Sequence, residues 1–134
     1  MCSLLLVEDD SHQRLLLREE LVEEGYDVRT AASAREALAR LYTARPDLVV
    51  LDPDMPGTDG TQLLSRLLGM KRHLPVVIYT AYSGSQESFT SWAADAHVLK
   101  QSDLGELKAK IREVLEKRGV RPGRPAARLP LSGV

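Results

Sequence analysis

The sequence predicts an α/β fold in which a parallel β-sheet carries helices on both faces. Short apolar runs, which are typical of buried strands, alternate five times with segments that have helical spacing. The connections between these segments are short, and strand–helix repeats of this kind require parallel strands. The chain has 134 residues, of which 43% are hydrophobic and 28% charged, so it fits one globular domain.

The first expected strand covers residues 4–7, a continuous apolar run of the kind that is buried on both faces of a sheet. Ser11 then provides an N-cap for a helix, and Gly25 provides the positive φ that often ends one. The apolar side chains of this helix are Leu15, Leu16, Leu17, Leu21 and Val22. A more polar strand is expected at residues 27–30, and its polarity favours an edge position in the sheet.

The second helix begins with a capping box. Ser33 and Glu36 are three residues apart, a spacing at which each side chain can bond the backbone at the other end of the turn. The helix ends before Pro46, which interrupts helical hydrogen bonding, and its apolar residues are Ala37, Leu38 and Leu41. Another buried strand is expected at residues 48–51, followed by a loop rich in proline and glycine at residues 53–60.

The second half of the chain repeats the pattern. A third helix is expected from leucines at helical spacing, namely Leu63, Leu64, Leu67 and Leu68. Strands follow at residues 76–80 and 96–99, separated by a weak helical segment at residues 82–94. The last helix takes Asp103 as its N-cap, and one face carries an apolar stripe that consists of Leu107, Ile111, Val114 and Leu115.

Basic residues are concentrated at the end of the chain. Residues 118–134 contain four arginines, three prolines and three glycines but no acidic residue. We therefore expect a folded domain at residues 1–117, followed by a flexible basic tail at residues 118–134. The tail leaves two interpretations open: the chain acts alone through protein contacts, or the tail begins a linker in a longer protein.

Composition argues against several classes of protein. The formal net charge is −1, so nucleic acid is not an expected partner. No apolar run approaches the roughly 18 residues that cross a bilayer, and the N-terminus lacks the basic region of a signal peptide, so we expect a cytoplasmic protein without a membrane partner. The single cysteine, Cys2, excludes an internal disulfide and a cysteine-based zinc site.

Polar side chains stand where four of the expected strands end. Because the carboxyl ends of parallel strands meet at one edge of a sheet, these side chains should converge there. In chain order they are Glu8, Asp9, Asp10, Asp52, Thr80 and Lys100. Crowded carboxylates repel one another, and Mg²⁺ relieves this repulsion while binding phosphate oxygens. The set therefore predicts a site where Asp52 is a nucleophile toward phosphorus, with Lys100 and Thr80 stabilising the phosphoryl oxygens.

The same segments resemble the receiver domains of two-component response regulators. The matching pieces are residues 5–10, 47–57, 77–81 and 97–100, and the resemblance runs from about residue 3 to residue 117. It implies a three-layer α/β/α fold of the flavodoxin-like kind, with a five-stranded parallel sheet of order 2-1-3-4-5. It also implies a phosphorelay function in which a sensor histidine kinase or a phosphotransfer protein donates the phosphoryl group.

The resemblance assigns roles to individual residues. Asp52 is expected to accept the phosphoryl group, and Lys100 matches the family's invariant lysine. Mg²⁺ is expected to bind Glu8, Asp9 and Asp52, together with the backbone carbonyl of Asp54; Asp10 falls one place after the acidic pair.

The family pattern also implies a switch. Thr80 would move toward the phosphoryl group, and His97 stands where the family usually has a tyrosine or phenylalanine. Asp54 and Tyr82 occupy the positions that flank the path of the hydrolytic water. Gln101 replaces a common proline, so the conformation of the Lys100–Gln101 peptide is left open.

Three functions compete at this point. The leading interpretation is a signalling receiver that phosphorylates and slowly dephosphorylates itself, without an outside substrate. Asp52 and Asp54 also resemble the Asp-x-Asp motif of haloacid-dehalogenase-type phosphatases, although that family places the motif on its first strand rather than its third. The last alternative is a receiver-like module that binds partners without phosphorylation, which the intact acidic residues argue against. The downstream target is not predicted.

Overall fold

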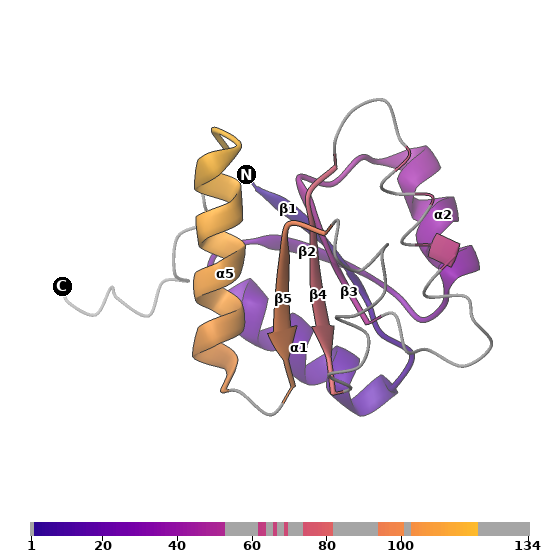
Figure 1. Cartoon of the computed structure of the whole chain (residues 1–134). Helices are drawn as coiled ribbons and strands as arrows, with labels where there is room; N and C mark the ends of the chain where they lie inside the picture. Colours follow the sequence, from indigo (N-terminus) through magenta and orange to yellow (C-terminus); the bar gives the residue numbers. More distant parts are fainter. Residues whose placement is uncertain are drawn as a thin grey trace, which may run out of the picture.

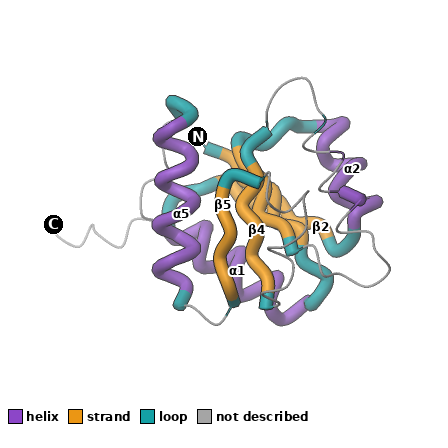
Figure 2. The backbone as a smooth tube through the Cα atoms, in the orientation of Figure 1, coloured by secondary structure: helices purple, strands orange, loops and turns teal. Residues whose placement is uncertain are grey.

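The computed structural model describes residues 2–52, 62, 63, 66, 69, 74–81, 94–100 and 103–120. Its centre is a five-stranded, all-parallel sheet of order β2-β1-β3-β4-β5 (Figures 1 and 2). The strands are β1 (Ser3–Val7), β2 (Asp27–Ala31), β3 (Leu48–Leu51), β4 (Val76–Thr80) and β5 (Ala96–Leu99). Among the residues that the structure describes, the helices with defined bounds are α1 (Ser11–Glu23), α2 (Ala34–Thr43) and α5 (Leu104–Lys117). This arrangement confirms the predicted fold class and strand order.

Two apolar layers lie on the two faces of the sheet. One layer contains residues of α1 and α5 packed on side chains such as Leu4, Leu6 and Val50. The other contains Ala37 of α2 and Leu63, packed on the alternate side chains of the same strands. Figure 1 shows α1 and α5 together on one side of the sheet and α2 on the other. The three inner strands β1, β3 and β4 are buried on both faces, which explains their continuous apolar runs.

Helix α1 begins differently from the prediction. Its N-cap is Asp10, and Ser11 is the first helical residue. The Asp10 carboxylate accepts hydrogen bonds from the backbone amides of His12 (2.9 Å) and Gln13 (3.2 Å). The bond from Gln13, followed by that from His12, lowers the pKa of Asp10. The carboxylate thus competes successfully with the neighbouring serine for the capping position.

The other predicted helix ends agree with the structure. Gly25 has a φ of 98° just beyond α1, a conformation that favours glycine. Ser33 caps α2 by accepting a bond from the Glu36 amide, while the Glu36 carboxylate accepts one from Ala32. Asp103 caps α5 as expected. Of the apolar residues expected on α1, Leu17 and Leu21 are buried, whereas Leu15, Leu16 and Val22 are exposed.

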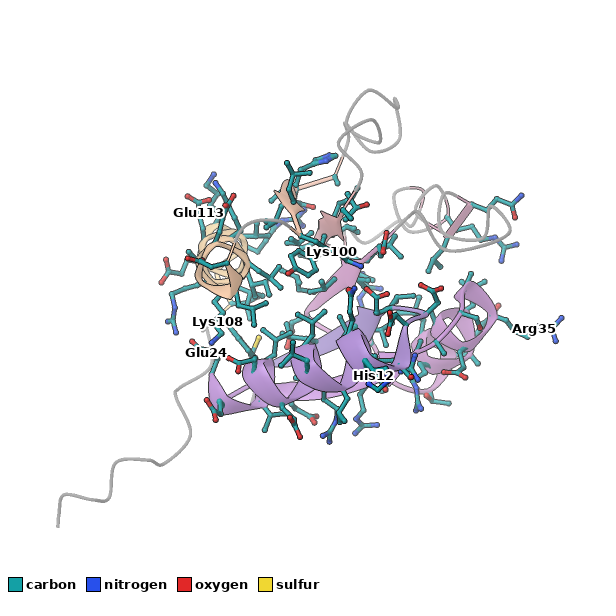
Figure 3. The ribbon with its side chains drawn as sticks, turned by 90° about the horizontal axis from the view of Figure 1, so that it is seen from below. His12, Glu24, Arg35, Lys100, Lys108 and Glu113 are labelled. Carbon is teal, nitrogen blue, oxygen red and sulfur yellow. The ribbon has the colours of Figure 1, made fainter. Side chains whose placement is uncertain are left out.

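Ion pairs of Lys108 also link α5 to α1. The Lys108 ammonium group lies 2.8 Å from the Glu20 carboxylate and 3.6 Å from that of Glu24. Figure 3 shows Lys108 of α5 directed toward Glu24, the C-cap residue of α1. The expected third helix, the segment at residues 82–94 and the basic tail lie largely outside the described residues. Across the described ranges, no helix combines the length and apolar character needed to span a membrane.

Candidate functional site

The predicted polar residues meet at the carboxyl edge of the sheet. Figure 3 views the molecule from this edge, and Lys100 lies near the centre of the view. Glu8 follows β1, Asp52 follows β3, Thr80 ends β4 and Lys100 follows β5. The strand register pairs Val7 with Leu51 and Leu51 with Ile78, so Glu8 and Asp52 follow at the same level. Thr80 and Lys100 lie one and two residues further along, on the same edge of the sheet. Glu8, Asp52 and Lys100 therefore converge at this edge, as expected for the carboxyl ends of parallel strands.

Three carboxylates form a compact cluster at this edge. Glu8, Asp9 and Asp52 each offer an oxygen, and these oxygens lie within 4.8 Å of one another. Glu8 and Asp52 are 2% and 8% exposed, whereas Asp9 faces solvent. Asp10 serves instead as the cap of α1.

Lys100 joins the two buried carboxylates. Its Nζ donates hydrogen bonds of 2.8 Å to Oε1 of Glu8 and of 2.8 Å to Oδ2 of Asp52. Burial acts to lower the pKa of Lys100, but the bonds to Asp52 and Glu8 outweigh it, so the pKa of Lys100 is raised. Burial raises the pKa of Glu8, and the bond from Lys100 offsets only part of that effect. Lys100 is consequently a permanent cation at neutral pH, held between two desolvated acids.

Thr80 and His97 lie on neighbouring strands. Thr80 is 1% exposed, and its carbonyl accepts a bond of 2.8 Å from the backbone amide of Lys100. His97 is half-buried on the edge strand β5 and pairs in register with Ile78. The structure thus brings Thr80 next to the acid–lysine group through the backbone. Asp54, Tyr82 and Gln101 lie outside the described residues.

Sequence patterns did not indicate the role of Arg14. Its Nη1 donates to the backbone carbonyls of Glu8 (2.9 Å) and Asp9 (3.3 Å), so the guanidinium reaches back from α1 to the acidic loop. The available signal was the spacing alone, an arginine in the first turn of a helix that follows the acidic pair. Such a reach-back contact depends on side-chain conformation, which sequence patterns do not determine.

The donor set of the cluster fits a hard divalent cation. Mg²⁺ prefers oxygen ligands and is commonly held by one or two carboxylates with waters and phosphate oxygens. Three carboxylates within 4.8 Å, one of them open to solvent, supply that chemistry. The fold and the site together define an α/β domain with a candidate Mg²⁺ and phosphoryl site at the carboxyl edge of its sheet.

Sequence comparison identifies the family. Residues 4–112 match the response regulator receiver domain, and the chain belongs to this family. It is 38% identical over 129 residues to the transcriptional regulatory protein AfsQ1 of Streptomyces coelicolor, covering 95% of this chain and 56% of AfsQ1. It is 36% identical over 115 residues to sporulation initiation phosphotransferase F of Bacillus subtilis, covering 84% of this chain and 92% of that protein. The chain spans about half the length of the transcriptional regulators that it matches.

Solved structures agree with this assignment. The response regulator TrrA of Thermotoga maritima, in complex with Mg²⁺-BeF, aligns with a TM-score of 0.81 and 39% identity, covering 86% of this chain and 100% of TrrA. TrrA in complex with the histidine kinase ThkA aligns with a TM-score of 0.78 and 39% identity, covering 86% of this chain and 99% of TrrA. The chain is a receiver domain of two-component phosphorylation signalling.

Proposed function

We propose that this receiver accepts a phosphoryl group on Asp52 and that Mg²⁺ is its cofactor. The observation that carries the proposal is the position of Lys100, whose ammonium lies 2.8 Å from both Asp52 and Glu8 beside a cluster of three carboxylates. A carboxylate nucleophile next to a permanent cation and a candidate metal site is suited to phosphoryl transfer. Glu8, Asp9 and Asp52 would hold Mg²⁺, with the carbonyl of Asp54 as a further ligand by family resemblance.

The reaction is a displacement at phosphorus. A carboxylate oxygen of Asp52 forms the new bond to phosphorus, and the bond from phosphorus to the donor's nitrogen or oxygen breaks, its electron pair leaving with the donor. Lys100 counters the negative charge that gathers around the acceptor, and the Thr80 hydroxyl offers a neutral donor to a phosphoryl oxygen. When bound, Mg²⁺ supplies the positive charge that offsets the phosphoryl oxygens.

The proposed phosphoryl donor is a sensor histidine kinase or a phosphotransfer protein. The related protein TrrA forms a crystalline complex with the histidine kinase ThkA, which supports a donor of this class. We further propose that Thr80 and His97 form the switch that changes the protein-contact surface, and that Asp54 and Tyr82 tune dephosphorylation. On this view the domain modifies itself and turns over no outside substrate, and its downstream target is a protein.

The decisive experiment is intact mass spectrometry after incubation with acetyl phosphate. The parent chain should gain one phosphoryl mass with Mg²⁺ and none with a chelator, and Asp52→Ala should gain none. Asp95→Ala serves as a control, because Asp95 lies at the opposite edge of the sheet before β5. Undiminished labelling of Asp52→Ala would refute the assignment. Multiple turnover of p-nitrophenyl phosphate, abolished in Asp54→Ala, would instead favour the phosphohydrolase alternative.

A further inference from the structure

Arg14 ties the first turn of α1 to the acidic loop at residues 8–10. Its backbone amide donates to the carbonyl of Asp10 (2.9 Å), which is the first bond of the helix. Its Nη1 donates to the carbonyls of Glu8 (2.9 Å) and Asp9 (3.3 Å), which are the two residues whose side chains enter the carboxylate cluster. One side chain therefore holds the backbone of both acids from the side of the helix.

We propose that Arg14 is a positioning residue for the metal site, one that keeps the Glu8 and Asp9 carboxylates directed toward Asp52. The inference rests on the proposed function, in which these three carboxylates hold Mg²⁺. Lys100 already holds the Glu8 carboxylate beside Asp52. The Asp9 carboxylate repels both of these acids, so without restraint the loop at Asp9 would relax away from them. Bonds from partners behind a metal site hold the ligands in place, and their loss typically lowers metal affinity 10- to 100-fold.

Other hydrogen bonds hold the two ends of this loop, whereas Arg14 holds the backbone at its middle residue, Asp9. At the strand end, the Glu8 amide donates to the Ala31 carbonyl of β2 (3.0 Å). At the helix end, Asp10 caps α1, and its amide donates to Oε2 of Glu8 (3.2 Å). Between these two ends, the Asp9 carbonyl is held by the Arg14 guanidinium. Asp9 is also the exposed member of the cluster, so burial restrains it least.

The two possible roles of Arg14, as a positive charge and as a positioning residue, predict opposite effects of its removal on Mg²⁺ affinity. If the guanidinium acted mainly as a positive charge beside the site, it would repel Mg²⁺, and its removal would tighten binding. If it acts by holding the loop, its removal weakens binding. We expect positioning to dominate, because Arg14 is partly exposed and its charge is screened by water and salt. The sign of the change in Mg²⁺ affinity therefore separates the two roles.

The test measures Mg²⁺ affinity of the full 134-residue chain by isothermal titration calorimetry at constant pH and ionic strength. Arg14→Met should weaken Mg²⁺ binding about 10-fold. Arg14→Lys, which keeps a cation able to donate to a carbonyl, should weaken it less. Arg18→Met is the matched control, since Arg18 is an exposed arginine one turn later on α1, and its affinity should stay within about twofold of the parent. Far-ultraviolet circular dichroism verifies that each variant is folded.

Unchanged or tighter Mg²⁺ binding by Arg14→Met overturns the proposal, as does a lysine variant that is as weak as the methionine variant. A parent chain that binds no Mg²⁺ overturns it as well. Phosphorylation by acetyl phosphate is measured in parallel, and raised Mg²⁺ should restore the rate of Arg14→Met. A parent chain that binds Mg²⁺ without gaining a phosphoryl group refutes the proposed function, while the affinities still decide the role of Arg14.

Discussion

Among the side chains of the site, Lys100 should contribute most to the free energy of unfolding of the metal-free protein. The perturbation is Lys100→Met, which keeps much of the aliphatic length and removes the charge. The variant leaves Glu8 and Asp52 facing each other at side-chain exposures of 3% and 10%, without their shared cation. The consequence is two desolvated carboxylates that repel each other, a state that the parent protein avoids.

The magnitude follows from the geometry. At 2.8 Å and an effective dielectric constant of about 20, each ion pair has a gross attraction of about 6 kcal/mol, most of which desolvation cancels. Breaking a buried pair by removing one partner costs about 3–5 kcal/mol. Because this site lies at the rim of the sheet and its third acid is exposed, we expect the lower end, about 3 kcal/mol.

The assay is urea unfolding in the presence of a chelator, fitted as a two-state transition. Lys110→Met provides the control, because Lys110 pairs with Glu113 on the surface, at side-chain exposures of 42% and 51%. Loss of this exposed pair should cost less than about 0.5 kcal/mol. Adding Glu8→Gln to Lys100→Met should recover about 1–2 kcal/mol, since it removes one of the two opposed charges. A loss below about 1 kcal/mol in Lys100→Met, or no recovery in the double variant, would refute the reasoning.

Three further outcomes are expected. Asp9→Asn should weaken Mg²⁺ binding because it removes a carboxylate ligand, and it should raise the melting temperature of the metal-free protein because it removes like-charge repulsion. Calorimetry measures both quantities, and an Mg²⁺ affinity equal to that of the parent contradicts the ligand assignment. Ser33→Ala should cost about 1 kcal/mol in urea unfolding because α2 loses its N-cap, whereas Ser11→Ala, at the first helical residue of α1, should cost much less. Burial, aided by Asp47, raises the pKa of the Cys2 thiol from 9.0 to about 11. The neutral thiol's contribution to the free energy of unfolding is therefore fully present below pH 9 and is lost as the pH rises toward 11. That loss amounts to about 3 kcal/mol. The pH dependence of stability over this range should be shallower in Cys2→Ala, and equal slopes would contradict the prediction.

The strands could be predicted almost to the residue, and for a physical reason. A strand buried on both faces must be apolar along its whole length, so the predicted runs at residues 48–51 and 76–80 coincide with β3 and β4. The predicted residues 96–99 coincide with β5 as well, although this is an edge strand in which Val98 alone is fully buried. The convergence of Glu8, Asp52 and Lys100 followed from topology, because all parallel strands end at one edge. Neither inference needed side-chain geometry.

Contacts that depend on side-chain conformation were not predictable in this way. Ser11 and Asp10 are both good helix caps, and the choice between them depends on where the backbone leaves the strand. The sequence predicts Lys100 beside the acids, but the pairing of its ammonium group with both Glu8 and Asp52 depends on the conformation of the lysine side chain. Arg14 was missed for the same reason, since its target is a backbone carbonyl that every residue possesses.

The packing of α1 against α5 has a consequence for how the protein is made. One apolar layer combines Leu17 and Leu21, from the start of the chain, with Leu107 and Ile111, from its last helix, and Lys108 joins the two helices across 88 positions of sequence. On a ribosome, the early strands and α1 emerge long before α5 exists to cover them. Contacts of such large sequence separation form late, and their absence leaves apolar surface open to aggregation. We therefore expect the nascent chain to expose the apolar face of its early strands and α1 until α5 has left the exit tunnel.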